Sequence, residues 1–164
     1  LEEETMPERK ADAAAALPRV AALAERRTAE IVRFLRDMIA IPSESGQEGA
    51  VVARVRAEME RLGFEEIRVD GLGNVLGRVG SGSTVVALDG HLDTVGVGDR
   101  STWARDPYLG EERDGVVYGR GAGDQRGAIP PMLRIKHVSS QRNTSSSGAE
   151  DECFGVRILP VIFG

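Results

Sequence analysis

The chain has 164 residues, of which 41% are hydrophobic and only 4% aromatic, and its formal net charge at pH 7 is −5. This length and composition predict one domain with an aliphatic α/β core. The sequence contains no long basic run and no membrane-length apolar run, so we expect the protein to bind neither nucleic acid nor a membrane. The single cysteine, Cys153, and the acidic N-terminus, unlike a secretory signal, favour a cytoplasmic location.

Two helices are predicted in the first part of the chain. Residues 1–27 are rich in Ala, Glu and Arg and contain Pro18, so we expect a flexible extension with at most a frayed helix. A firm helix is predicted over residues 28–40, with Thr28 as its N-cap, because apolar residues recur on one face. A second helix is predicted to begin at a capping box formed by Ser45 and Glu48 and to end at Gly63.

Strands dominate the rest of the chain. They are predicted at residues 65–70, 74–79, 85–88, 116–119 and 156–163. Residues 85–88 are apolar at every position, which is typical of a central strand buried on both faces. A helix is expected over residues 127–138, with Pro130 and Pro131 in its first turn, followed by a polar loop at 141–148. The predicted fold class is therefore α/β, with a mixed sheet flanked by helices.

Residues able to bind a metal follow two of these strands. The run D-G-H-L-D-T-V presents His91 and Asp93, which are two residues apart and can therefore point the same way. The run G-R-G-A-G-D-Q-R-G presents Asp124 in a glycine-rich turn. Imidazole and carboxylate form a common ligand set for hydrolytic zinc. We therefore predict that His91 and Asp124 converge at the carboxyl ends of neighbouring strands.

The remaining polar residues near these motifs have plainer interpretations. Four glycines of the second motif are expected to let the backbone turn sharply and bring Asp124 close to a metal: Gly119, Gly121, Gly123 and Gly127. Arg126 is expected to be solvated, and His137 to have no ligand role. The acidic run 150–152 is interpreted as a charged loop. Loop packing is expected of Trp103, Asp106 and Pro107.

Two motifs and a W-x-x-D-P-Y loop between them, in this order, resemble the M20 family of metallopeptidases and amidohydrolases, especially its branch of selenium-metabolism hydrolases. The family includes acetylornithine deacetylase, succinyl-diaminopimelate desuccinylase and carboxypeptidases. The resemblance covers about residues 28–164. It implies the N-terminal part of a zinc-peptidase-like catalytic domain with two zinc ions per site, cobalt or manganese being alternatives.

The resemblance also implies a role for each site residue. His91 would bind one metal ion, Asp124 would bridge both, and Asp93 would act in catalysis by fixing the orientation of the imidazole. The peptide bond between Asp124 and Gln125 would be cis. The substrate would be a small N-acylated amino acid or a peptide whose amide bond is hydrolysed, and full-length family members are often homodimers.

Other parts of the family pattern are not found in this sequence. The predicted strand at 156–163 resembles the one that leads to a Glu-Glu pair with the general base, and the sequence ends at Gly164. We therefore expect a chain truncated before the lid or dimerisation domain and inactive alone. Two alternatives stay open, namely a non-catalytic binding or interaction module and a dinucleotide-binding domain. The second rests on the glycine-rich turn between a strand and a helix, although its spacing is not G-x-G-x-x-G.

Overall fold

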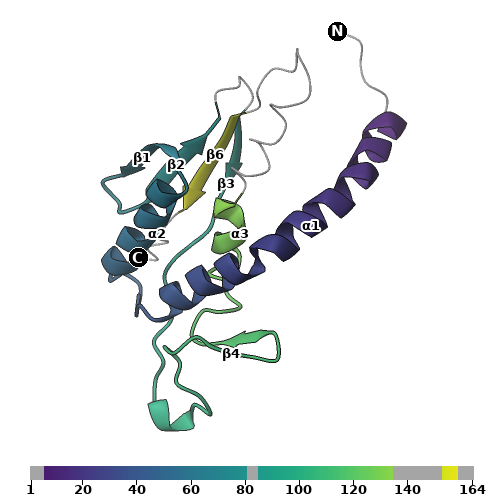
Figure 1. The fold of residues 1–164 in the computed structure, drawn as a ribbon. Coiled ribbons are helices and arrows are strands. Elements are labelled where there is room, and N and C mark those ends of the chain that lie inside the picture. Colours follow the sequence, from purple (N-terminus) through teal and green to yellow (C-terminus); the bar gives the residue numbers. More distant parts are fainter. Residues whose placement is uncertain (1–5, 81–84, 135–152, 159–164) are drawn as a thin grey trace.

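The computed structural model describes residues 6–80, 85–134 and 153–158 (Figure 1). The helices are α1 (Met6–Ile39), α2 (Gly49–Arg61), α3 (Ile129–Leu133) and the 3₁₀ helix η1 (Arg100–Thr102). The strands are β1 (Glu65–Val69), β2 (Val75–Val79), β3 (Val85–Leu88), β4 (Glu111–Arg113), β5 (Val116–Tyr118) and β6 (Cys153–Ile158). Three segments interpreted above lie outside the described residues: the position of His137, the loop at 141–148 and the acidic run at 150–152.

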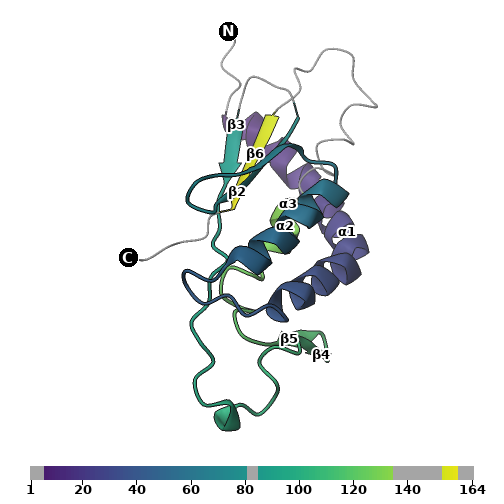
Figure 2. The same cartoon turned by 90° about the vertical axis from the view of Figure 1, so that its left-hand side faces the viewer.

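Four of the strands form one mixed sheet in the order β1-β2-β6-β3. Strands β3 and β6 are parallel, with Val85 opposite Cys153, whereas β2 is antiparallel to both of its neighbours. Figure 2 shows α1, α2 and α3 on one side of this sheet. Strands β4 and β5 form a separate antiparallel hairpin. The predicted α/β class with a mixed sheet and flanking helices is confirmed.

Strand β3 is less buried than its sequence predicted. It lies at the edge of the sheet in the part of the chain that the structure describes, and it pairs there with β6 alone. Val85 is 63% exposed and Val86 is 42% exposed. The prediction of a central strand buried on both faces is therefore wrong, because an apolar run indicates a strand but not its place in the sheet order.

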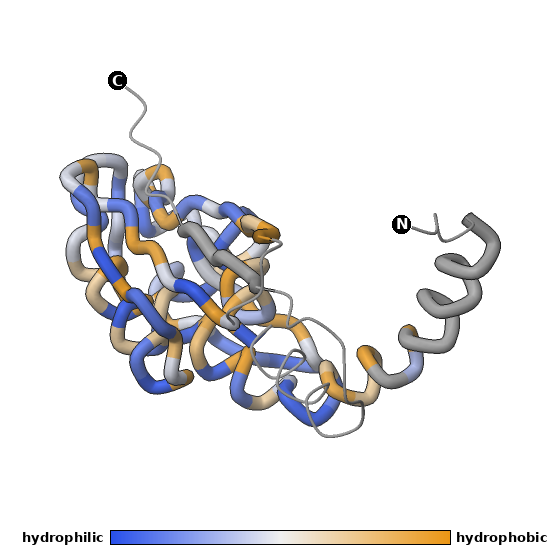
Figure 3. The backbone as a smooth tube through the Cα atoms, turned by 90° about the horizontal axis from the view of Figure 1, so that it is seen from above, coloured by the Kyte–Doolittle hydropathy of each residue, from blue (hydrophilic) through white to orange (hydrophobic). Residues whose placement is uncertain are grey.

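Helix α1 begins much earlier than the sequence predicted. It runs without interruption from Met6, through Pro18, to Ile39. Thr28 lies inside it and donates its hydroxyl to the carbonyl of Ala24 at 3.1 Å, so its assignment as an N-cap is wrong. Ala, Glu and Arg have high helix propensity, which favours a helix over the whole of this segment. Figure 1 shows the N-terminal end of α1 extending away from the sheet, and Figure 3 shows hydrophobic and hydrophilic residues alternating along the part of the chain that it colours. The flexibility of residues 1–27 stays a prediction.

The hydrophobic core lies between the helices and the sheet. Its fully buried members are Met38, Ile39, Val51, Val55, Met59, Val75, Leu92, Ile129 and Leu133. Helix α2 ends before Gly63, whose φ of 70° confirms the predicted C-terminal glycine. Helix α3 carries Pro130 and Pro131 in its first turn, as predicted, but ends at Leu133. Among the described residues, none of the helices combines the length and apolar character needed to cross a lipid bilayer.

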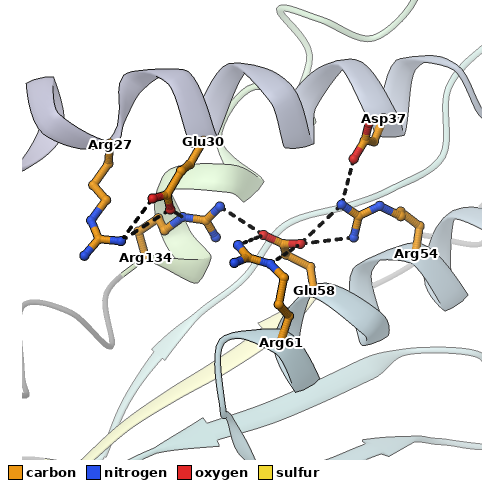
Figure 4. Close-up of polar contacts among 7 residues, drawn as sticks. All are labelled: Arg27, Glu30, Asp37, Arg54, Glu58, Arg61 and Arg134. Atoms are coloured by element: carbon orange, nitrogen blue, oxygen red, sulfur yellow. Dashed lines mark hydrogen bonds and ion pairs between the residues drawn. The ribbon is translucent and has the colours of Figure 1, made fainter.

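A buried carboxylate joins the three helices (Figure 4). Glu58 of α2 is 2% exposed and accepts hydrogen bonds from Arg61 at 2.6 Å, from Arg134 at 2.9 Å and from Arg54 at 3.2 Å. Arg54 also pairs with Asp37 of α1 at 2.7 Å. Burial raises the pKa of Glu58, but the hydrogen bonds from the arginines outweigh it and lower the pKa from 4.5 to about 2.

Candidate functional site

The structure brings His91, Asp93 and Asp124 together. The Nε2 atom of His91 lies 3.3 Å from Oδ1 of Asp124, and its Nδ1 atom lies 3.0 Å from Oδ1 of Asp93. His91 follows β3 of the main sheet, whereas Asp124 follows β5 of the separate hairpin. The predicted convergence is therefore confirmed, but its expected basis in neighbouring strands of one sheet is wrong. The Asp124 side chain is 72% exposed and that of His91 is 24% exposed.

Asp93 lies behind the imidazole and is largely buried. One carboxylate oxygen, Oδ2, accepts a hydrogen bond from the hydroxyl of Ser45 at 2.8 Å. The other, Oδ1, is close to Nδ1 of His91 but not well aligned for a hydrogen bond. The capping box predicted at Ser45 is wrong, because its hydroxyl is bound to Asp93. Glu48, its supposed partner, instead accepts a hydrogen bond from the backbone N–H of Gly46 at 2.8 Å.

The turn that carries Asp124 is held against the His91 segment by the residue that follows. The side-chain oxygen of Gln125 accepts a hydrogen bond from the backbone N–H of His91 at 3.3 Å. The peptide bond between Asp124 and Gln125 is trans, so the cis bond implied by the family resemblance is wrong. The chain reverses here through the positive φ of 44° at Gln125.

Arg126 is the largest departure from the sequence-based interpretation. It was expected to be solvated, but it is fully buried at 0% exposure. Its guanidinium donates to the carbonyl oxygens of Met38 at 2.7 Å, Ile41 at 3.2 Å and Leu92 at 3.3 Å, and to the hydroxyl of Ser43. Burial lowers the pKa of Arg126 to about 10, which leaves it charged at neutral pH. The five donors of a planar guanidinium suit such a set of acceptors.

The loop between the two motifs is held by its own side chains, as predicted. The indole N–H of Trp103 donates to the carbonyl oxygen of Val97 at 2.8 Å. Asp106 accepts from the backbone N–H of Tyr108 at 2.9 Å, and the Pro107 carbonyl accepts from that of Arg120 at 2.8 Å. The Arg120 guanidinium also lies over the Trp103 ring at 4.7 Å. These contacts join the loop to the glycine-rich turn.

Metal-binding side chains are few in the described part of the chain. Across residues 6–80, 85–134 and 153–158, no three His, Cys, Asp or Glu side chains are grouped so that they could hold one ion. The pair formed by His91 Nε2 and Asp124 Oδ1 is therefore the chemical centre of the candidate site. It offers one imidazole nitrogen and one carboxylate oxygen, which are ligand atoms that zinc and other divalent ions bind.

Comparisons with known proteins identify relatives of this chain. The family described as Peptidase family M20/M25/M40 matches residues 87–143, which include the three site residues. The protein YgeY of Escherichia coli strain K12 is 47% identical over 124 residues, covering 76% of this chain and 30% of that protein. Succinyl-diaminopimelate desuccinylase of Xanthomonas campestris pv. campestris strain B100 is 36% identical over 108 residues, covering 65% and 29%. The chain thus spans about 30% of the length of these curated relatives.

Solved structures agree on the fold. Human carnosine dipeptidase 1 superimposes with a TM-score of 0.70 at 24% identity, covering 87% of this chain and 34% of that protein. The M20 family metallo-carboxypeptidase Sso-CP2 of Sulfolobus solfataricus has a TM-score of 0.63 at 19% identity, covering 79% and 30%. The partial coverage is consistent with an N-terminal part. In sequence and in fold, this chain is therefore similar to part of the M20 metallopeptidases, and these relatives support a metal-dependent hydrolase as its parent family.

Proposed function

We propose that this chain carries the first part of a metal-dependent amidohydrolase site, in which His91 and Asp124 bind metal and Asp93 orients His91. The observation that carries the proposal is the distance of 3.3 Å between His91 Nε2 and Asp124 Oδ1. Two donors that each lie about 2.0–2.1 Å from one tetrahedral zinc ion are about 3.3–3.4 Å apart. The two atoms therefore fit the ligand spacing of a single zinc ion.

A second metal ion fits the exposure of Asp124. Its side chain is 72% exposed, so its other carboxylate oxygen is free to bind a further ion. A Bacillus subtilis protein described as a dinuclear metal binding peptidase of the M20 family has the same fold, with a TM-score of 0.58. Zinc is the proposed metal, and the donor set also suits cobalt or manganese. A metal bound here would lower the pKa of water and polarise a substrate carbonyl.

The proposed reaction is hydrolysis of an amide or N-acyl bond in a small substrate. Relatives of this chain include a desuccinylase at 36% identity, and proteins of the same fold include a dipeptidase and a carboxypeptidase. These names have in common the cleavage of a C–N bond next to a carbonyl group. They do not support the alternative of a dinucleotide-binding domain. Asp124 also places a negative charge in the turn where that alternative requires a phosphate.

The chain of 164 residues alone is proposed to bind metal but not to turn over substrate. A catalytic zinc ion usually has about three protein ligands, whereas His91 and Asp124 supply two donors. A positioned general base typically accelerates such reactions by about 10²–10⁴-fold, and no described residue is assigned this role. The two donors should therefore bind metal weakly, without productive attack on an amide.

An assay of metal binding and hydrolysis tests this proposal. The purified chain is loaded with zinc or cobalt and offered N-acetyl amino acids, N-succinyl amino acids and dipeptides. We expect metal uptake that is lost in His91→Ala and Asp124→Ala, and no turnover. Metal uptake that survives both substitutions would contradict the ligand assignment and favour a non-catalytic module. Metal-dependent turnover that both substitutions abolish would contradict inactivity and direct attention to His137, Glu150 and Glu152.

A further inference from the structure

Arg126 connects the candidate site to helix α1 from the buried side. Its hydrogen-bond acceptors come from three segments of the chain. They are the carbonyl of Met38 in the last turn of α1, the carbonyl of Ile41 and the hydroxyl of Ser43 just beyond the helix, and the carbonyl of Leu92. Leu92 lies between His91 and Asp93 in the chain. The guanidinium of Arg126 therefore binds the backbone segment that carries both of these side chains.

The turn at Asp124 contacts the His91 segment through consecutive residues. Asp124 faces the imidazole of His91, Gln125 accepts from the backbone N–H of His91, and Arg126 donates to the carbonyl of Leu92. The two motifs come from separate sheets, so these contacts substitute for the strand pairing that would otherwise hold them in register. Of the three, only Arg126 is fully buried and also bound to α1.

Ser43 strengthens the same connection. Its hydroxyl donates to the carbonyl of Leu92 at 2.8 Å and accepts from Arg126, and its backbone carbonyl accepts from the N–H of Thr94 at 2.8 Å. Ser43 is itself 0% exposed. The backbone from Leu92 to Thr94 is therefore hydrogen-bonded to Ser43 at both residues and to Arg126 at Leu92.

Stability alone is a poor explanation for a charged group in this place. The acceptors of Arg126 in the described part of the chain are neutral carbonyl and hydroxyl oxygens. Burial of a charge is costly, and the negative charge of Asp93 offsets only part of this cost, since burial still lowers the pKa of Arg126 to about 10. An apolar side chain of similar size would fill the space at lower cost. An apolar side chain, however, could not donate hydrogen bonds to the carbonyl oxygens of several segments, as the planar guanidinium of Arg126 does.

We propose that Arg126 is a positioning residue that sets the spacing between His91 and Asp124. The inference deepens the proposed function, because metal binding by this pair depends on that spacing. Residues that orient metal ligands typically change metal affinity by about 10–100-fold when they are substituted. We expect the same range for Arg126→Lys, which keeps the charge but loses the planar set of donors.

The test compares Arg126→Lys with Arg33→Lys, a matched substitution at an exposed arginine of α1. One readout needs no metal, namely the ¹⁵N NMR signals of the imidazoles in a chain that has two histidines. The His91 signals are identified by their loss in His91→Ala. The second readout is the zinc dissociation constant. We expect Arg126→Lys to shift the His91 signals and to weaken zinc binding about 10–100-fold, with neither change in Arg33→Lys.

The outcomes separate this inference from the proposed function. A wild-type chain that binds no zinc would refute the proposed function, while a shift of the His91 signals in Arg126→Lys would still support the positioning role. Unchanged His91 signals in folded Arg126→Lys would overturn that role, even if the melting temperature fell. If Arg126→Lys does not fold, Ser43→Ala decides the matter in the same way. It removes the hydroxyl shared by Arg126 and the Leu92 carbonyl.

Discussion

At the scale of single residues, Ser45 links the α1–α2 connection to the candidate site. Its hydroxyl donates to Asp93 at 2.8 Å, and the other oxygen of Asp93 lies 3.0 Å from the imidazole of His91. The Asp93 carboxylate is 10% exposed, so it has little access to water and depends on such partners. The hydroxyl of Ser45 thus contacts the carboxylate of Asp93, which in turn lies beside Nδ1 of the His91 imidazole, the ring nitrogen opposite Nε2. We propose that the orientation of His91 depends on this series of contacts.

Substitution of Ser45 by alanine tests this series. We expect Ser45→Ala to weaken zinc binding about 10-fold, because the carboxylate that orients His91 is no longer held. The free energy of unfolding should fall by only about 1 kcal/mol, since one hydrogen bond at an exposed residue is lost. Isothermal titration calorimetry and urea unfolding measure the two quantities, and Ser101→Ala in η1 is the control. A zinc affinity equal to that of the control would show that Ser45 does not act on the site.

The glycine-rich turn offers a second test at the residue scale. Gly121 has a φ of +75°, and a Cβ atom there would lie 2.6 Å from Cγ2 of Thr94, whereas Gly123 has no atom within 4 Å. We expect Gly121→Ala to destabilise the fold by roughly 2–4 kcal/mol and Gly123→Ala to leave it almost unchanged. Equal effects in urea unfolding would contradict this. Of these two glycines, both expected to be needed for the turn, only Gly121 is sterically required.

At the scale of helices and strands, the cluster around Glu58 fixes how the helices pack. Three arginines bind the carboxylate of Glu58: Arg54 and Arg61 from α2, and Arg134 from the C-terminal end of α3. Arg134 also lies 3.4 Å from the carboxylate of Glu30 in α1 (Figure 4). The arginines stabilise the charged form of Glu58, which explains its low pKa despite its burial. Loss of the carboxylate would leave several positive charges close together without their common partner.

The substitution Glu58→Gln measures the contribution of this cluster. We expect the free energy of unfolding at pH 7 to fall by roughly 3 kcal/mol, because a buried charge pair is broken. Glu60→Gln on the same helix is the matched control, since Glu60 pairs with Arg56 while both side chains are about half exposed. It should cost less than about 1 kcal/mol. Urea unfolding of both variants gives the comparison, and equal losses would contradict a special role for Glu58.

The stability of the wild-type protein should also depend on acidity through Glu58. Its pKa is lowered from 4.5 to about 2 in the folded state, so its contribution is complete above pH 4.5 and is lost as pH falls toward 2. The shift corresponds to roughly 3 kcal/mol. The difference in unfolding free energy between wild type and Glu58→Gln should therefore shrink over this range. A difference that stays constant from pH 5 to about pH 2 would refute the assignment.

The elements show what the sequence could and could not predict. Apolar periodicity correctly indicated α2 and the strands β1, β2, β3 and β5, because these patterns report local geometry. Strand β4 was not predicted, and β6 begins at Cys153, before the predicted start at residue 156. The periodicity did not indicate that β3 lies at an edge, since sheet order depends on long-range pairing. Ser45 matched a capping box, and Arg126 looked like a surface charge. Both were misinterpreted because their partners lie far away in the sequence, 48 residues for Ser45 and up to 88 for Arg126.

At the scale of the whole molecule, the chain spans about 30% of the length of its curated relatives. The described residues bring His91 Nε2 and Asp124 Oδ1 to 3.3 Å from each other, and we propose that both atoms bind one metal ion. His91 and Asp124 follow strands of two separate sheets. Hydrogen bonds between the His91–Leu92 segment and Gln125, Arg126 and Ser43 connect the two motifs. The motifs alone predicted that His91 and Asp124 would meet. They could not predict the buried contacts that make them meet, because those contacts involve backbone carbonyls.

X-ray absorption spectroscopy of the zinc-loaded chain tests the central claim that His91 and Asp124 bind one metal ion. The account predicts one imidazole nitrogen at about 2.0–2.1 Å from zinc, with the remaining ligands oxygen atoms. The imidazole scattering should disappear in His91→Ala and persist in His137→Ala, the matched substitution at the second histidine. Imidazole scattering that persists in His91→Ala, or zinc bound by oxygen atoms alone in the wild-type chain, would contradict the account.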